Sequence, residues 1–261
     1  MTQPIDKALL ARTLIEAANS ATGIQPLTNT WPDLDPVTAY EIQDAVVQAR
    51  VDAGQVVVGA KTGLTSKAKQ VQMNVGEPLS GFLTNDMQID VGEPLVCSRF
   101  IQPRCEVEIA FLLKDDLQGP QVTAADVIAA TDLVFAAVDV IDSRFTGYKF
   151  TYQDVIADNC SCAGFVLGGR GVDPRGIDLR LVGATLEKNG SLVATAAGAA
   201  VMGHPAGAVA WLVRKLAERG KSLKAGHVVM CGALTEAVAV QPGDSVVARF
   251  DRLGTVEIAC V

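Results

Sequence analysis

The stretch Arg104-Cys-Glu-Val-Glu-Ile-Ala-Phe-Leu112 has the two-residue alternation of a β-strand. Side chains two residues apart share one face of a strand, so Glu106 and Glu108 project together while the apolar side chains between and after them face the other way. Two carboxylates held this close repel each other unless water or a cation neutralises them, and a divalent cation with oxygen ligands does so. A solvent-exposed polar strand face is the alternative interpretation of the same pattern.

Further strands follow along the chain. Residues 133–141 form a nearly continuous apolar run, and residues 181–187 are predicted to pair with residues 191–196 through Asn189-Gly190, a type I′ hairpin signal. Strands are also predicted near the C-terminus, at residues 227–231, 236–240, 245–250 and 255–261. Strands outnumber helices without regular alternation, which predicts the α+β class with a rolled or sandwich-like, mostly antiparallel sheet.

Helices are predicted at three places. Residues 4–20 carry apolar side chains at helical spacing. A second helix begins after the N-cap residue Asp35, with Pro36 in its first turn, and ends at Gly54. The third spans residues 205–219.

The segment between the helical and the strand-rich parts changes character at residue 55. Residues 55–61 are predicted to form a buried strand, after which Thr65 or Ser66 caps a short helix through about residue 73. We therefore expect an N-terminal helical α/β layer over residues 1–75 and a β-rich catalytic domain over residues 76–261, within one structural unit.

The composition favours a small-molecule ligand. The chain has 261 residues with 22 Lys and Arg against 29 Asp and Glu, so its net charge of -7 disfavours nucleic acid as a partner. The N-terminus lacks a basic segment followed by an apolar run, which predicts a cytoplasmic protein. Residues 195–213 are nearly uncharged, but Gly and Ala dominate them and Pro205 interrupts them, so no membrane span is predicted. The six cysteines are expected to be reduced and mostly buried.

A third acid and a lysine join the two glutamates as candidates for chemistry. Asp139 interrupts the apolar run at residues 135–141, where a lone carboxylate is costly without a partner, so it is expected to complete a three-carboxylate site. Because the chain has only two histidines, oxygen ligation indicates Mg²⁺ or Mn²⁺. Lys61 ends an apolar strand, where desolvation would lower its pKa and suit it to acid/base work; a surface lysine is the alternative.

Residues 154–161 are dense in side-chain donors and acceptors, which predicts either a polar site that orients a ligand or a capped turn. Together with the features above, motifs from this segment occur in the order known from one family. These are Gly59-Ala-Lys-Thr-Gly-Leu-Thr-Ser66, the Glu106 and Glu108 pair, Val138-Asp-Val-Ile-Asp-Ser-Arg144, Ala157-Asp-Asn159 with Ser161, Gly203-His-Pro205 and Leu253-Gly-Thr-Val256. By these motifs the chain resembles the hydratase/decarboxylase family of the fumarylacetoacetate hydrolase superfamily over nearly its whole length.

The resemblance implies a fumarylacetoacetase C-terminal-like fold and a specific division of roles. It implies that Glu106, Glu108 and Asp139 bind Mg²⁺ or Mn²⁺, which chelates the 2-oxo acid end of a small unsaturated (di)carboxylic acid. The third ligand is usually glutamate, and Asp139 is one methylene shorter. The resemblance places Lys61 beside the substrate as an acid/base or carboxylate-binding group. We take Lys61, Ser161 and Leu79 as the catalytic candidates, and Lys61, Thr65, Ser161 and Asp158 as the candidates that bind substrate.

Two activities compete within that family. Hydratases add water to 2-hydroxypenta-2,4-dienoate, and decarboxylases remove carbon dioxide from 2-oxohex-3-enedioate, also called 4-oxalocrotonate, in meta-cleavage catabolism of aromatics. Hydratases usually carry an acid in a Pro-Asp-aromatic-Gly segment, whereas Leu79 stands there in Glu77-Pro-Leu-Ser-Gly81. An apolar wall excludes water and favours loss of a carboxylate, so Leu79 indicates a metal-dependent decarboxylase, a carbon-carbon lyase.

Other readings stay open. The hydratase activity is the first alternative, followed by acylpyruvate hydrolysis or oxaloacetate decarboxylation. A chain without activity that stabilises a paralogous hydratase is a further one. The resemblance also implies a homo-oligomer and a complex with that hydratase. A lysine amine lodged permanently among the three acids would contradict the metal site.

Overall fold

A seven-stranded sheet forms the centre of the computed structural model, which describes residues 5–66, 70–71 and 75–261. Its strands lie in the spatial order β2 (Leu79–Thr84), β1 (Val57–Gly63), β8 (Val228–Met230), β3 (Arg104–Leu113), β4 (Thr131–Ile141) and β5 (Cys162–Leu167), and β9 (Val238–Ala239) also pairs with β3. Its neighbouring strands are antiparallel except for the parallel pair of β1 and β8.

A second sheet of four strands packs against the first. Its order is β11 (Gly254–Ala259), β10 (Ser245–Phe250), β6 (Gly183–Lys188) and β7 (Ser191–Ala197). The β6–β7 hairpin turns at Asn189 and Gly190, whose φ angles of 53° and 75° are both positive, as a type I′ turn requires. The predicted hairpin is confirmed, and so is the α+β class with curled, mostly antiparallel sheets.

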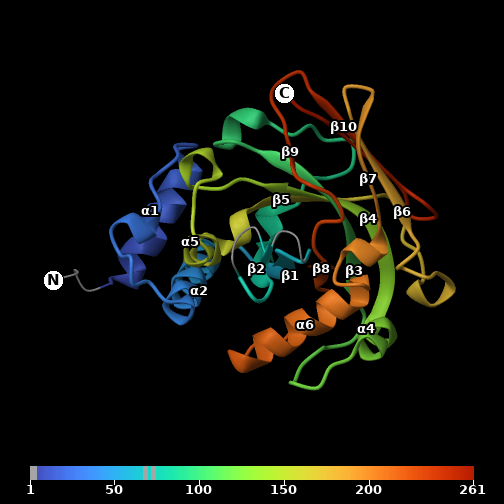
Figure 1. Ribbon diagram of the computed structural model, residues 1–261, viewed down its shortest axis with the longest axis horizontal. Helices are drawn as coiled ribbons and strands as arrows, with labels where there is room; N and C mark the ends of the chain where they lie inside the picture. The colour runs from blue at the N-terminus through green and yellow to red at the C-terminus, as the bar shows by residue number, and fades with distance from the viewer. Residues whose placement is uncertain (1–4, 67–69, 72–74) are drawn as a thin grey trace.

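Helices cover the large sheet from two directions (Figure 1). Helices α1 (Lys7–Asn19), α2 (Pro36–Asp52) and α5 (Tyr152–Ala157) pack together on one side, and α4 (Ala124–Ala130) packs on α6 (Pro205–Glu218) on another. Asp35 caps α2 by accepting hydrogen bonds from the backbone N–H groups of Val37 and Thr38, as predicted. No helix among the described residues is long and apolar enough to cross a membrane.

Successive side chains of β3 point to opposite faces of the sheet, and each face packs into a different core. Val107, Ile109 and Phe111 face the core shared with the second sheet and α6. Ala110 instead belongs to the core beneath α1, α2 and α5, so Glu106 and Glu108 on the same face point toward this helical side. The sheet therefore presents its two glutamates within a layered interior rather than to bulk solvent.

Several boundaries differ from the sequence-based expectation. The strand predicted at residues 236–240 is reduced to Val238–Ala239, and helices α4 and α5 had not been predicted. The short helix predicted through about residue 73 includes residues 67–69 and 72–73, which lie outside the described residues. Strand β1 pairs with β2 and β8 across the predicted boundary at residue 75, and the division into two layers stays a prediction.

Candidate active site

Three carboxylates meet on the helical side of the large sheet. Glu106 on β3 lies directly opposite Asp139 on β4 in the strand register, and Glu108 follows on the same face of β3. One oxygen from each of the three lies within 4.8 Å of the others. Glu108 and Asp139 have no exposed surface and Glu106 is 8% exposed, so the alternative of a solvated strand face is wrong.

Glu108 is incompletely satisfied by the protein. Its Oε2 accepts a hydrogen bond of 2.7 Å from the backbone N–H of Gly232, just beyond β8. Its Oε1 is buried and has no hydrogen-bond partner among the described residues. Burial and the nearby Asp139 carboxylate raise the pKa of Glu108 well above its ordinary value. A buried acceptor without a donor is costly, and a cation would remove that cost.

Lys61 on β1 reaches this cluster and forms a buried ion pair with Asp139. Burial alone lowers the pKa of Lys61, but Asp139 and other nearby anionic groups outweigh it and raise that pKa well above its ordinary value. The predicted lowering is therefore wrong, because the sequence did not show that the desolvated amine has a carboxylate beside it. The ion pair joins Lys61 to Asp139, and Glu108 Oε1 still has no hydrogen-bond partner among the described residues, so the lysine does not satisfy all three acids.

A cavity of about 330 Å³ opens next to the three acids. Five of the predicted residues line it, namely Lys61, Thr65, Leu79, Glu106 and Ser161, whereas Glu108 and Asp139 lie outside its lining. Leu79 has no exposed surface and presents an apolar wall. The remaining lining is mixed and includes Arg104, Tyr148, Phe150, Cys160 and Glu236. The cavity thus joins an acidic end to apolar and cationic surfaces.

Asp158 is not among the residues that line this cavity. It forms a buried ion pair with Arg144 and accepts a hydrogen bond of 3.3 Å from the hydroxyl of Ser161. Asn159, Cys160 and Ser161 follow with φ angles of 50°, 58° and 53°, a left-handed conformation that is costly for residues other than glycine. Asp158 therefore acts on the cavity through the turn that carries Ser161.

Two cavity residues were missed by the sequence reasoning. Arg104 opens the quoted strand and shares a face with Glu106, which the two-residue period could have indicated. Tyr148 follows Gly147 in the loop after β4, and its placement depends on a positive φ of 55° that no local sequence pattern predicts. Gly232 was also missed, because it contributes only its backbone N–H, which donates a hydrogen bond to Glu108.

The comparisons with known proteins agree with this geometry. Residues 55–261 match the family model described as fumarylacetoacetate (FAA) hydrolase C-terminal. The chain belongs to the fumarylacetoacetate hydrolase family. It is 43% identical over 247 residues to a 4-oxalocrotonate decarboxylase of Pseudomonas putida, covering 95% of this chain and 94% of the relative. It is also 40% identical over 253 residues to a 2-keto-4-pentenoate hydratase of Paraburkholderia xenovorans (strain LB400), covering 97% and 94%.

A solved structure extends the likeness within the fumarylacetoacetate hydrolase family. The 4-oxalocrotonate decarboxylase from Pseudomonas putida G7, complexed with magnesium and adipate, superposes with a TM-score of 0.95 at 40% identity. The superposition covers 98% of this chain and 97% of that chain. The resemblance stated from the motifs is confirmed.

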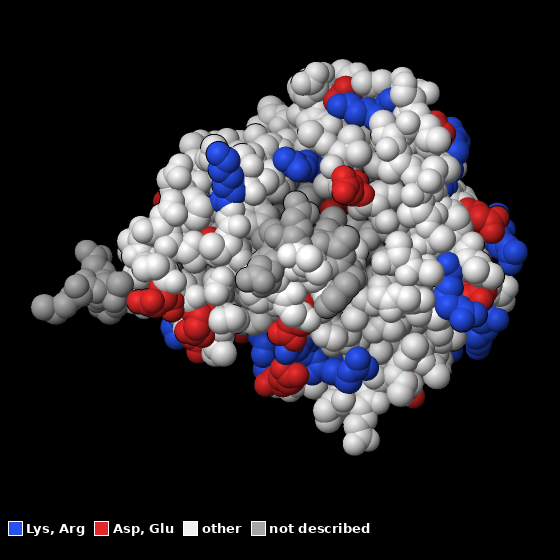
Figure 2. Space-filling view, in the orientation of Figure 1, with Lys and Arg blue, Asp and Glu red and all other residues white. Residues whose placement is uncertain are grey.

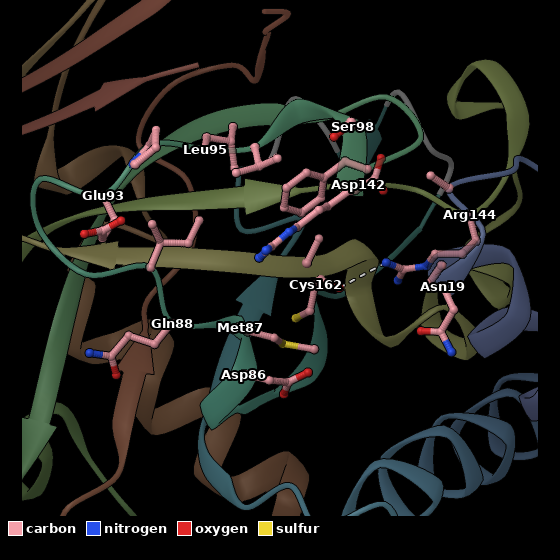
Figure 3. Close-up of a pocket in the computed structure, with 18 of the residues that line it drawn as sticks. Asn19, Asp86, Met87, Gln88, Glu93, Leu95, Ser98, Asp142, Arg144 and Cys162 are labelled. Atoms are coloured by element: carbon pink, nitrogen blue, oxygen red, sulfur yellow. Dashed lines mark hydrogen bonds between the residues drawn. The ribbon is translucent and has the colours of Figure 1, made fainter. Parts of the chain in front are cut away.

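A second cavity, of about 750 Å³, is lined by residues 86–90, 93–96 and 98–100 and by the end of α1 (Figure 3). Arg144 in its wall donates a hydrogen bond of 3.0 Å to the Cys162 carbonyl. Asp142 accepts hydrogen bonds from the backbone N–H groups of Ile101 and Gln102. Arg144 and Asp142 are thus both satisfied by hydrogen bonds within the protein. They do not form a second acidic cluster like that of Glu106, Glu108 and Asp139.

The surface gives no sign of a nucleic-acid site on the face seen in Figure 2. Lys and Arg are interspersed there with Asp and Glu, without a continuous basic patch over the described part of that face. A phosphate backbone binds to clustered positive charge. The small cavity beside the three acids is therefore the candidate active site.

Proposed function

We propose that this protein catalyses the magnesium-dependent decarboxylation of 2-oxohex-3-enedioate to 2-hydroxypenta-2,4-dienoate. The observation that carries the proposal is the buried side chain of Leu79 in the wall of a cavity that is also lined by Glu106, one of three clustered carboxylates. The names of the relatives at 40% to 43% identity, decarboxylases and hydratases, support the same class of substrate.

The acidic cluster fits a hard divalent cation. Its ligand atoms are all carboxylate oxygens, which Mg²⁺ and Mn²⁺ prefer, and one of them is the buried Glu108 Oε1, which has no hydrogen bond among the described residues. Glu106, Glu108 and Asp139 would hold the ion. When bound, it supplies Lewis acidity toward the carboxylate and oxo oxygens of a 2-oxo acid.

The protein's own groups then account for the remaining steps. As the bond from C5 to C6 breaks and carbon dioxide leaves, its electron pair moves through the conjugated chain to the C2 oxygen. Lys61, which lines the cavity and pairs with Asp139, holds a proton at Nζ for delivery to that oxygen. Leu79 keeps water from the departing carboxylate. Thr65 and Ser161 bind the 2-oxo acid head, and Asp158 orients the Ser161 hydroxyl.

The test compares the diacid with the dienoate, each with and without Mg²⁺. We expect carbon dioxide release from 2-oxohex-3-enedioate that stops after chelation and returns with Mg²⁺, and an unchanged ultraviolet band for 2-hydroxypenta-2,4-dienoate. Full activity in the chelated protein would contradict the metal mechanism. Rapid loss of the dienoate band would instead establish the hydratase, the second candidate, which the hydratase relatives favour.

The assembly is proposed on the resemblance, and the location on the sequence-based expectation given above. We expect a cytoplasmic homo-oligomer that also associates with a paralogous hydratase. Light scattering on the purified protein would test the first point, and a monomer at micromolar concentration would contradict it. Co-elution with a hydratase of this family would test the second.

A further inference from the structure

Arg104 lies on the same face of β3 as Glu106 and Glu108, and it lines the same cavity as Glu106. It is the first residue of β3, two positions before Glu106, and both line the cavity. Two strand residues advance about 6.6 Å along the sheet, so the guanidinium can lie well beyond the carboxylate cluster. The cavity lining therefore carries a guanidinium one two-residue step before Glu106, in addition to Lys61 and Glu236.

The guanidinium of Arg104 is held in place without a carboxylate. It stacks over the Tyr148 ring at 3.9 Å from the ring centroid. The Tyr148 hydroxyl donates within hydrogen-bond distance of the carbonyls of Ile141 (3.0 Å) and Gln102 (3.3 Å), which fixes the ring. Among the described residues no Asp or Glu forms an ion pair with Arg104, whereas Lys61, the other described cation of the lining, pairs with Asp139.

We propose that Arg104 selects dicarboxylate substrates by binding the carboxylate remote from the 2-oxo acid head. The inference rests on the proposed function, which places that head at Glu106, Glu108 and Asp139. The five carbon-carbon bonds from C1 to C6 of an extended diacid span about 6 Å, close to the two-residue step along β3. A planar guanidinium with several donors suits a carboxylate, and its stacking on Tyr148 limits the side-chain entropy lost on binding.

Arg104 contributes to selection more than to the chemical step. Its ion pair is made with the carboxylate of the bound diacid, and in the transition state the negative charge moves away toward the C2 oxygen. An interaction that is no stronger in the transition state lowers KM without raising kcat. Arg104→Gln is therefore expected to raise KM for the diacid about tenfold, with kcat within about threefold of the wild-type value.

The experiment uses two saturated, unreactive ligands, 2-oxohexanedioate and 2-oxohexanoate, which share the 2-oxo acid head and differ in the distal carboxylate. Calorimetric titrations with Mg²⁺ compare the wild type, Arg104→Gln, Arg104→Lys and the control Arg99→Gln, an exposed residue outside this cavity. We expect the wild type and the control to prefer the diacid at least tenfold. Arg104→Gln should lose that preference while its affinity for 2-oxohexanoate changes less than twofold, and Arg104→Lys should restore part of it.

Two results would overturn the inference: equal weakening of both ligands in Arg104→Gln, or an unchanged preference for the diacid. The proposed function fails separately, through absence of carbon dioxide release by the wild type. If the wild type released none and the diacid preference still disappeared in Arg104→Gln, the dicarboxylate site would stand and the reaction assignment would fall.

Discussion

Glu108 is a buried carboxylate that the described residues satisfy only in part. It has no exposed surface, one oxygen on the Gly232 N–H and the other without a hydrogen bond among the described residues. Burial and Asp139 raise its pKa because a second negative charge there is unfavourable. The protein thus keeps a destabilising cluster that a divalent cation would stabilise.

Glu108→Gln should separate these effects. Without metal the variant should melt at a higher temperature than the wild type, because one of three clustered charges is gone. Mg²⁺ should no longer raise its melting temperature, and kcat should fall on the order of 10²-fold or more. Scanning calorimetry and the decarboxylation assay measure both. The matched change Glu257→Gln at an exposed strand position should leave both unchanged, and a Mg²⁺-dependent melting shift of wild-type size in Glu108→Gln would contradict the ligand assignment.

Leu79 is the residue on which the choice of reaction depends. Leu79→Asp should lower decarboxylation about 100-fold, since a hydrated carboxylate in the cavity wall weakens binding of the diacid and admits water beside the departing carboxylate. Hydration of 2-hydroxypenta-2,4-dienoate should appear in the same variant. Leu79→Met, which keeps the wall apolar at similar volume, should retain at least a third of the activity. Unchanged decarboxylation in Leu79→Asp, measured as carbon dioxide release, would remove Leu79 from the mechanism.

At the residue scale, the sequence predicted which side chains form the site better than it predicted their pKa values. The strand period and the apolar run around Asp139 were enough to predict three acids on one face. The direction of the Lys61 pKa was predicted wrongly, because it depends on which carboxylate lies across β1 in the fold. The hydrogen bond from the Gly232 N–H to Glu108 depends on the path of the backbone, so the residue type at position 232 could not predict it.

At the scale of elements, the turn after α5 holds the cavity wall. Asp158 and Arg144 form a buried ion pair beneath it, and the Asn159 side chain bonds both the N–H and the carbonyl of Phe82 in β2. These bonds hold three successive residues in the left-handed region. The turn therefore ties β2, which carries Leu79, to the segment that carries Ser161.

The ionisation of Asp158 gives a pH test of this turn. Burial raises its pKa to about 6 despite the Arg144 guanidinium. An acid with a raised pKa in the folded state binds its proton more tightly there, so its contribution to stability is greatest below about pH 4 and is lost as the pH rises through 6. Urea unfolding from pH 4 to 7 should show a less negative slope of unfolding free energy against pH in Asp158→Asn than in the wild type. The slope is the readout, because the variant also leaves Arg144 without its partner; identical slopes would contradict the shift.

Elements with local signals were predictable and the others were not. Asp35 with Pro36 fixed the start of α2, and Asn189-Gly190 fixed the β6–β7 hairpin. Helices α4 and α5 were overlooked although Thr123 with Asp126 and Thr151 with Asp154 form capping boxes, a signal present in the sequence. The left-handed run after α5 has no glycine, so tertiary contacts and not local preference determine it.

For the whole molecule, the order of strands depends on contacts far apart in the chain. Strand β8 inserts between β1 and β3 although about 170 residues separate it from β1, and it pairs with β1 in parallel. Periodicity could predict each strand but not this placement, because a two-residue pattern carries no information on the partner. Gly232 comes from that same insertion, which explains why the site was predicted without it.

The layered interior also determines thiol reactivity. All six cysteines are free and buried, as predicted, and burial raises the pKa of Cys105, Cys160, Cys162 and Cys231. Thiolate is the reactive form, so fewer than one thiol per chain should react with an aromatic disulfide reagent within minutes at pH 7.5, and all six should react in denaturant. Absorbance of the released thiolate measures both. Rapid reaction of two or more native thiols would contradict the packing.

The most direct test of the account is a crystal structure of the protein grown with Mn²⁺ and 2-oxohexanedioate, with anomalous data. The account predicts one anomalous peak bounded by oxygens of Glu106, Glu108 and Asp139, and ligand density from that peak toward Arg104. Absence of a peak there at saturating Mn²⁺, with the Lys61 amine occupying the centre of the three carboxylates instead, would contradict it.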